Sequence, residues 1–166
     1  MIRVLQLIVD NTSGVLSRIS GLFSRRGYNI ESITAGITAD PRYTRITIVT
    51  SGDEDILEQI EKQVGKLVDV RDIRVLETHD SVFRELVLIK VKVGDDKRQT
   101  LISICEVFRS SIIDITKDSM IIELTGDQSK INAFIEMLSD YEILEIARTG
   151  IAGLRRGSEG VIYLND

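Results

Sequence analysis

The sequence predicts an α+β fold built from two consecutive βαββαβ units. Three observations support this prediction. The chain has 166 residues, enough for two small units of about 80 residues each. The spacing of its apolar residues gives the order strand, helix, strand, strand, helix, strand, and gives it twice. A polar break at 77–81 separates the copies, so we expect one unit at 1–78 and a second at 79–166.

The first unit opens with a strand and an amphipathic helix. The largely apolar run at 4–9 favours a buried strand. A helix then follows Gly14 and ends at Gly27, because glycine readily takes the left-handed conformation that stops a helix. The predicted core-facing stripe of this helix comprises Val15, Leu16, Ile19, Leu22 and Phe23.

The rest of the first unit reads as a hairpin, a helix and a last strand. Strands at 28–37 and 45–50 flank the turn-like segment 39–42, which holds the only proline. The second helix begins after 51–53, and a strand follows at 70–76. The apolar face of this helix is predicted to comprise Ile56, Leu57, Ile60, Val64 and Leu67.

The second unit repeats the plan with a different sequence. Its strands are expected at 86–93, 112–116, 120–125 and 143–148. Its two helices carry their apolar residues at helical spacing, namely Leu101, Ile104, Cys105 and Phe108 in one and Ile131, Phe134, Ile135 and Leu138 in the other. Both units therefore fit a ferredoxin-like sandwich, with two helices on one face of a four-stranded antiparallel sheet.

A ferredoxin-like unit leaves the second face of its sheet uncovered. The strand segment 86–89 is apolar at consecutive positions, which indicates burial on both faces. A second copy of the chain is the economical cover for such a face or edge. We therefore expect a homodimer or a higher oligomer.

Composition excludes several classes of function. A net charge of −5 and a pI near 5.0 argue against general attraction to nucleic acid or anionic membranes. No apolar run approaches the roughly 20 residues of a transmembrane helix, and the N-terminus lacks a secretory pattern, so a cytoplasmic location is expected. Cys105 and His79 are the only residues of their types, and we interpret them as a buried thiol and a linker histidine.

The most distinctive local feature is the turn between the first strand and the first helix. Its residues Asn11, Thr12 and Ser13 are candidate helix caps, and Gly14 allows close approach of the backbone to a ligand. A helix N-terminus suits a carboxylate. We predict an amino-acid site from Asn11, Thr12, Ser13, Gly14, Val15, Leu16, Asn29 and Ile30, with Ile33 as further apolar wall. The residues alone, however, favour a plain capped turn.

The sequence carries no recognisable catalytic or metal motif. It lacks a GxxxxGK[ST] loop, an HExxH pair and a cysteine–histidine pair. Acidic residues at 53–55 and 95–96 begin predicted helices, where they stabilise the helix dipole. We therefore expect no catalytic residue and no bound metal.

One run of residues carries a family resemblance. Residues 21–32 read GLFSRRGYNIES, and shorter matches follow at 58–63, 66–70, 84–86 and 147–150. In these segments the chain resembles the small regulatory subunit of acetolactate synthase (acetohydroxyacid synthase), which belongs to the ACT-domain family. The resemblance implies an N-terminal ACT domain that binds the effector and a C-terminal ACT-like domain for oligomerisation or contact with the catalytic subunit.

The resemblance also implies a function. Such a chain activates a thiamine-diphosphate-dependent large subunit and confers allosteric feedback inhibition by valine in branched-chain amino acid biosynthesis. Thiamine diphosphate, Mg and FAD would belong to the catalytic subunit, not to this chain. By the family pattern the effector lies between two chains, with Asn11 and Gly14 from one and Asn29 and Ile30 from the other. Ser13 replaces a proline common in ACT domains, and the choice among valine, leucine and isoleucine stays open.

Two other interpretations remain. An acylphosphatase-like small hydrolase would use an arginine and an asparagine near an anion loop, for which Arg18 and Asn29 are candidates. A free-standing ACT sensor could instead act on another target. The second unit lacks a matching turn because Gly94 precedes two acidic residues, and the tail 150–166 is either a flexible end or a partner surface.

Overall fold

A computed structural model describes residues 1–161, and these residues form two compact units. The first unit comprises Met1–Val82 together with the segment that begins at Ile151, and the second comprises Phe83–Gly150. The predicted boundary at 78/79 therefore lies four residues early. The prediction also placed the tail in the second unit, whereas the described tail residues 151–161 group with the first. No helix within residues 1–161 is long and apolar enough to span a membrane.

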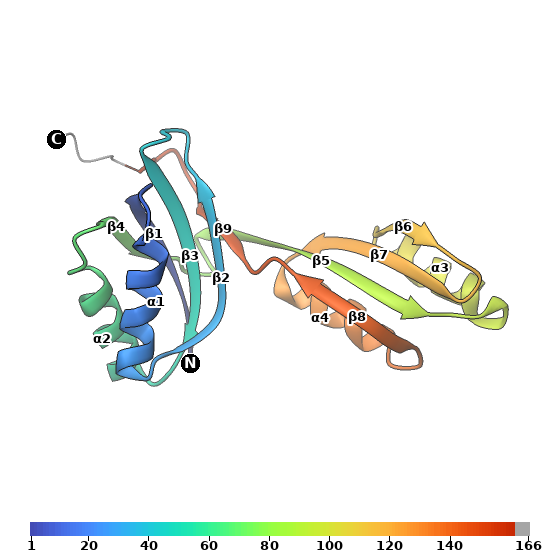
Figure 1. The fold of residues 1–166 in the computed structure, drawn as a ribbon. Coiled ribbons are helices and arrows are strands. Elements are labelled where there is room, and N and C mark those ends of the chain that lie inside the picture. Colours follow the sequence, from blue (N-terminus) through green and yellow to red (C-terminus); the bar gives the residue numbers. More distant parts are fainter. Residues whose placement is uncertain (162–166) are drawn as a thin grey trace. The chain divides into compact units, whose positions relative to one another are not determined.

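The first unit has the predicted βαββαβ order (Figure 1). Its four strands form one antiparallel sheet in the order β2-β3-β1-β4, so β2 and β4 are the edge strands. The elements are β1 (Ile2–Asp10), α1 (Val15–Arg26), β2 (Asn29–Ile37), β3 (Tyr43–Ser51), α2 (Glu54–Val64) and β4 (Val70–Val75).

Helix α1 forms because four apolar residues recur on one face and a glycine ends it. Gly27 has a φ of 66° and donates its N–H to the carbonyls of the last turn, which satisfies carbonyls that would otherwise lack a partner. The buried residues of the helix are Val15, Ile19, Leu22 and Phe23. The predicted stripe was wrong at Leu16, which is 49% exposed.

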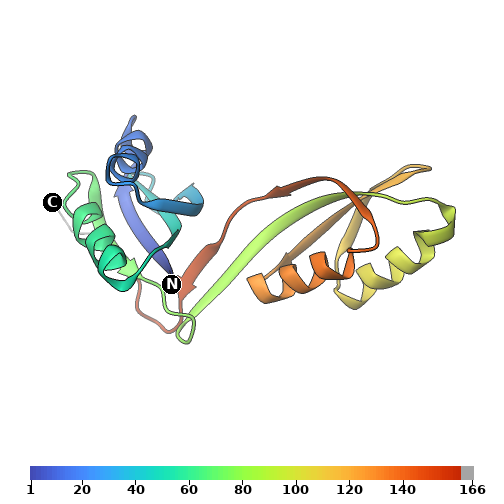
Figure 2. The ribbon, with the colours of Figure 1, turned by 90° about the horizontal axis from the view of Figure 1, so that it is seen from below.

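Both helices of the first unit pack on the same face of the sheet (Figure 2). Leu5, Leu7 and Val9 of β1 point to that face, since alternate residues of a strand share a face. The α2 residues Leu57, Ile60 and Val64 complete this core. Ile56, which was predicted to face inward, is 36% exposed.

The two central strands of the first sheet, β1 and β3, are also buried on the opposite face. Gln6 and Thr47 lie there, and each is 3% exposed. Arg45 bridges Gln6 to the tail, because its Nη2 donates to Gln6 Oε1 at 2.5 Å and to the carbonyl of Gly153 at 2.6 Å. The tail thus contributes to covering a face for which we had expected a second copy of the chain.

The second unit repeats the architecture, with its helices on one side of the sheet (Figure 2). Its sheet order is β6-β7-β5-β8, and the short β9, which the sequence did not predict, pairs with β5. The elements of this sheet and its helices are β5 (Ser81–Lys92), α3 (Asp95–Val107), β6 (Ser111–Ile115), β7 (Ser119–Gly126), α4 (Gln128–Met137) and β8 (Glu142–Arg148). Strand β9 (Ala152–Arg155) belongs to the tail segment that groups with the first unit.

An aromatic pair and a buried ion pair hold the second unit together. Phe134 is fully buried and meets Phe108 edge to face at 5.1 Å. Glu85 is 5% exposed and binds the guanidinium of Arg148 through two hydrogen bonds, which join β5 to β8. Cys105 lies in this core, and burial raises the pKa of its thiol, as expected for an inert structural cysteine.

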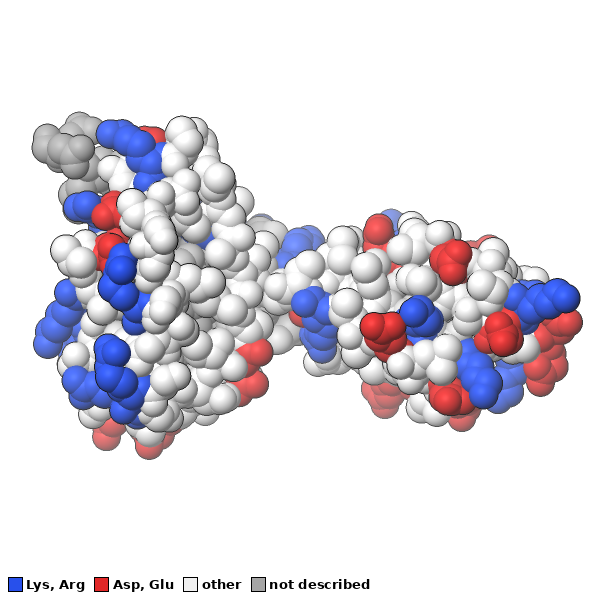
Figure 3. Space-filling view, in the orientation of Figure 1, with Lys and Arg blue, Asp and Glu red and all other residues white. Residues whose placement is uncertain are grey.

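Charge is distributed differently over the two units (Figure 3). Lys and Arg side chains gather over the helix side of the first unit, where Arg25 and Arg26 end α1. In the second unit the two signs are interspersed, and cross-strand pairs such as Lys90 with Glu145 account for part of that pattern.

Candidate functional site

The turn before α1 leaves the start of that helix uncapped. Gly14 occupies the N-cap position with a φ of 86°, and no side chain makes a capping hydrogen bond there. The prediction that Asn11, Thr12 or Ser13 caps the helix was therefore wrong. The first N–H groups of a helix have no partner within it, so those of α1 need acceptors from solvent, a ligand or elsewhere in the chain. No acidic residue occupies the first turn of α1 to compete for them.

Asn11 ties this turn to the hairpin between β2 and β3. Its backbone N–H donates to the carbonyl of Arg42 at 2.8 Å. Its side-chain Nδ2 donates to the carbonyl of Pro41 at 3.0 Å, and its Oδ1 accepts from Thr44 Oγ1 at 3.1 Å. Asn11 thus serves first as an anchor, and each of its amide atoms can still make one further hydrogen bond.

An ion pair between Arg18 and Asp69 lies next to the turn. Arg18 Nε lies 2.5 Å from Asp69 Oδ2, and Arg18 Nη2 donates to Asp69 Oδ1 at 3.0 Å. The guanidinium also lies under Gly14, since a Cβ at that position would come within 2.9 Å of Arg18 Nη1. The carbonyl of Asp69 accepts the N–H of Asp10 at 2.9 Å, so Asp69 fixes the point where the chain enters the turn.

The contribution of the Asp69 carboxylate to stability should depend on pH. The hydrogen bond from Arg18 is the largest cause that lowers the pKa of Asp69 below its ordinary value, and attraction to Arg18 and Arg71 lowers it further. A carboxyl whose pKa is lower folded than unfolded stabilises the fold above the unfolded pKa, and this stabilisation is lost as pH falls through the folded pKa. We expect Asp69→Asn to lower the free energy of unfolding at pH 7, with a difference from the unaltered protein that shrinks below pH 4. Urea titrations at several pH values would measure it, and a difference independent of pH would contradict the assignment.

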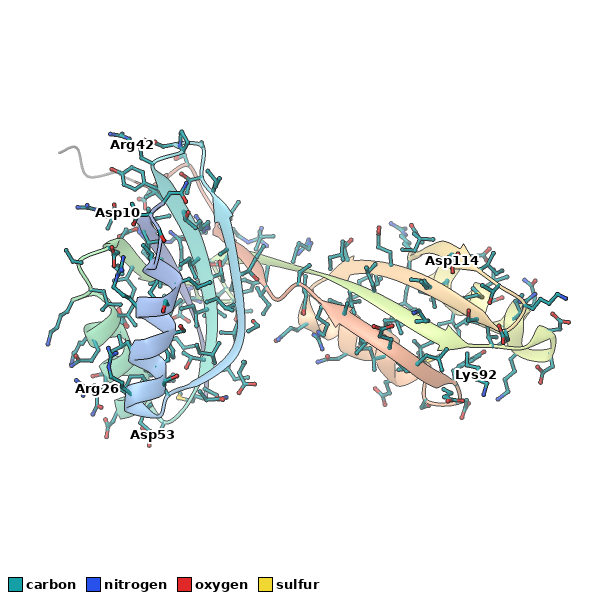
Figure 4. All side chains as sticks on the ribbon, in the orientation of Figure 1. Asp10, Arg26, Arg42, Asp53, Lys92 and Asp114 are labelled. Atoms are coloured by element: carbon teal, nitrogen blue, oxygen red, sulfur yellow. The ribbon has the colours of Figure 1, made fainter. Side chains whose placement is uncertain are left out.

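A second ion pair flanks the turn. Arg71 of β4 binds both carboxylate oxygens of Asp10, at 2.7 and 2.9 Å. Figure 4 shows Asp10 and Arg42 at one end of the first unit and Arg26 and Asp53 at the other. The turn therefore lies at the end of the sheet where guanidinium groups are paired with aspartates.

Asn29 lies at the other end of the same sheet. It begins β2 and pairs in register with Ser51, whereas Asp10, at the turn, pairs with Tyr43. These partners are the two ends of β3, which puts Asn29 about 26 Å from the turn along the strands. Asn29 Nδ2 donates to Glu31 Oε1 at 2.6 Å and to Ser51 Oγ at 3.0 Å. One chain does not bring Asn29 and the turn together.

The other predicted site residues divide between surface and core. Thr12, Ser13 and Leu16 are exposed beside Gly14. Val15 is only 4% exposed and packs in the core, so its side chain is not available as an apolar wall. Ile30 is partly buried against the same core at the Asn29 end.

Sequence reasoning missed the residues that fix the turn. Asp69 and Arg71 lie more than 50 positions after the turn, and only the pairing of β4 with β1 brings them to it. Arg18 had been considered as a hydrolase arginine, but its guanidinium is committed to Asp69. Among residues 1–161 there is no group of three or more side chains suited to hold a metal ion.

The two units match known families. Residues 5–72 match the model for the AHAS small subunit-like ACT domain, and residues 84–157 match the model for the small subunit of acetolactate synthase. The fold and this match define the first unit as an ACT domain. The second unit is the C-terminal part that accompanies it.

Full-length relatives identify the family more narrowly. The chain is 46% identical over 160 residues to the acetolactate synthase isozyme 3 small subunit of Salmonella typhimurium, covering 96% of this chain and 98% of that one. It is 45% identical over 161 residues to the Bacillus subtilis acetolactate synthase small subunit, covering 96% and 93%. The crystal structure of the Thermotoga maritima small subunit superposes with a TM-score of 0.86 at 40% identity and covers 96% and 99%. The chain belongs to the acetolactate synthase small-subunit family, and it is a non-catalytic, regulatory subunit.

Proposed function

We propose that this chain activates the large catalytic subunit of acetolactate synthase and confers feedback inhibition by valine or a related branched-chain amino acid. Membership of the small-subunit family supports a large subunit as partner. Thiamine diphosphate, Mg and FAD would then serve the large subunit, and this chain would contribute no reacting group. Valine would act by binding two states of the complex with different affinities.

The effector site is proposed to belong to two copies of the chain. The observation that carries this proposal is the edge position of β2, which has a pairing partner on one side only within the described sheet. If two β2 strands pair antiparallel about a two-fold axis, Asn29 of one copy approaches the Ile37 end of the other. Ile37 pairs in register with Thr44, and Thr44 Oγ1 binds Asn11. A dimer of this kind would place Asn29 beside the turn of its partner.

The chemistry of such a site fits an amino acid. The first N–H groups of α1 and the positive end of its dipole would hold the carboxylate. The amide oxygens of Asn11 and of the partner's Asn29 can accept from the ammonium. Leu16, which is 49% exposed beside the turn, would contact a short aliphatic side chain. Such contact separates ligands by only about 1–3 kcal/mol per methylene, so leucine and isoleucine are expected to compete.

A reconstituted assay tests the proposed function. We expect the purified large subunit to form acetolactate faster when this chain is added, and we expect valine to reduce that rate only when the chain is present. Because the large subunit alone lacks the proposed site, it should be insensitive to valine and serves as the control. An unchanged rate on addition of the chain would contradict the activating role, and valine-insensitive activity of the complex would contradict feedback inhibition.

A further inference from the structure

We propose that Arg18 and Asp69 form a positioning pair that holds the turn Asp10–Gly14 in its ligand-ready conformation and thereby sets the affinity for the effector. This inference rests on the proposed effector site. It adds two residues that do not themselves touch the ligand.

The pair controls both ends of the turn. At the entry, the carbonyl of Asp69 accepts the N–H of Asp10. At the exit, the guanidinium of Arg18 lies where a side chain of residue 14 would project, within 2.9 Å of a Cβ built there. Asp69 is 8% exposed and accepts two hydrogen bonds from that guanidinium. The same residue therefore contacts the start of the turn directly and the end of the turn through Arg18.

The geometry favours positioning over attraction of the ligand. Arg18 follows Gly14 by four residues and therefore reaches back toward the helix N-terminus on the same face. Two of its guanidinium nitrogens, Nε and Nη2, are held by the Asp69 carboxylate, whose negative charge offsets that of the guanidinium. The planar guanidinium instead fills space beneath the glycine. Lysine would keep the charge but lose this shape.

Loss of the Arg18 guanidinium should weaken the binding of valine. If the turn samples more conformations, only a fraction of molecules is competent at any time, and the apparent dissociation constant rises by the inverse of that fraction. We expect Arg18→Met to weaken valine binding about tenfold, and Arg18→Lys to give an intermediate loss.

The test compares full-length variants by calorimetry with valine and by amide hydrogen exchange. The matched control is Arg25→Met, because Arg25 follows Gly21 by the same four residues, with 3.4 Å from its Nη1 to a Cβ at Gly21, but lies about three helical turns after Gly14. We expect this control to bind within twofold of the unaltered protein. Exchange of the amides of residues 11–16 should rise in Arg18→Met and stay unchanged in Arg25→Met, whereas amides of β3 should be unaffected in both.

The outcomes separate this inference from the proposed function. Unaltered affinity and unaltered exchange in Arg18→Met would overturn the positioning role while leaving the valine site intact. Failure of the unaltered protein to bind valine would instead refute the effector site. Exchange at residues 11–16 would then decide alone whether the pair holds the turn. If Arg18→Met folds poorly, the same comparison with Arg18→Lys gives the answer.

Discussion

We expect replacement of Gly14 by aspartate to weaken the proposed binding of valine by at least about 100-fold. Three effects act together at this position. The backbone φ of 86° favours glycine, and a Cβ would come within 2.9 Å of Arg18 Nη1. The new carboxylate would also occupy the helix N-terminus and repel the ligand carboxylate. Loss of hydrogen bonds to a charged group costs about 1.5–3 kcal/mol each, and two of them account for the stated factor.

The same substitution should leave the protein folded. Aspartate tolerates the left-handed region better than most side chains, and the atom that its Cβ would meet is the far end of the flexible Arg18 side chain. Gly14→Ala is the matched control, because it adds the Cβ without the charge. We expect Gly14→Ala to lose less affinity than Gly14→Asp, and calorimetry measures both. Undiminished valine binding in Gly14→Asp would exclude the turn as the site.

The βαββαβ plan of each unit could be predicted because its signals are local. Helix α1 shows this well, since its apolar residues recur at helical spacing and Gly27 ends it at the expected place. Leu16 was the exception. Its position beside the stripe is compatible with burial on the helix wheel, but Leu16 is 49% exposed while its neighbour Val15 is buried.

The capping prediction failed for a reason that no local pattern contains. Asn11 has the right side chain for a cap, but its amide is bound by Pro41 and Thr44 of the hairpin, which lie at least 30 positions away. The hairpin itself was predicted, whereas its contact with the turn depends on the register of β1 and β3. Asp69 was missed for the same reason, because its contact with the turn also joins segments that are far apart in the sequence.

The tail and β9 were missed because their signals are weak. A strand of four residues that contains Gly153 shows no alternation by which it could be recognised. One of its contacts with the first unit is made by Arg45, whose guanidinium reaches from β3 to the carbonyl of Gly153. Long side chains that join distant segments in this way give no periodic pattern in either segment.

If two chains share the site, substitution of Asn29 should have the second large effect on valine affinity. Asn29→Ala should weaken valine binding by about 10-fold to 100-fold through loss of a hydrogen bond to a charged group. Its cost in stability should be small, because Asn29 is exposed and its side chain bonds only to the exposed Glu31 and the half-buried Ser51 among the described contacts. Gly14→Asp and Asn29→Ala homodimers should therefore both be folded and nearly unable to bind.

A mixed dimer of these two variants tests the central claim directly. One copy carries Gly14→Asp and retains Asn29, and the other carries Asn29→Ala and retains the turn, so each mixed dimer contains one intact site and one doubly altered site. Calorimetry on mixed dimers isolated with two affinity tags should show one valine bound per dimer with an affinity near that of the unaltered protein. Mixed dimers that bind no better than either homodimer would contradict a site shared between two chains.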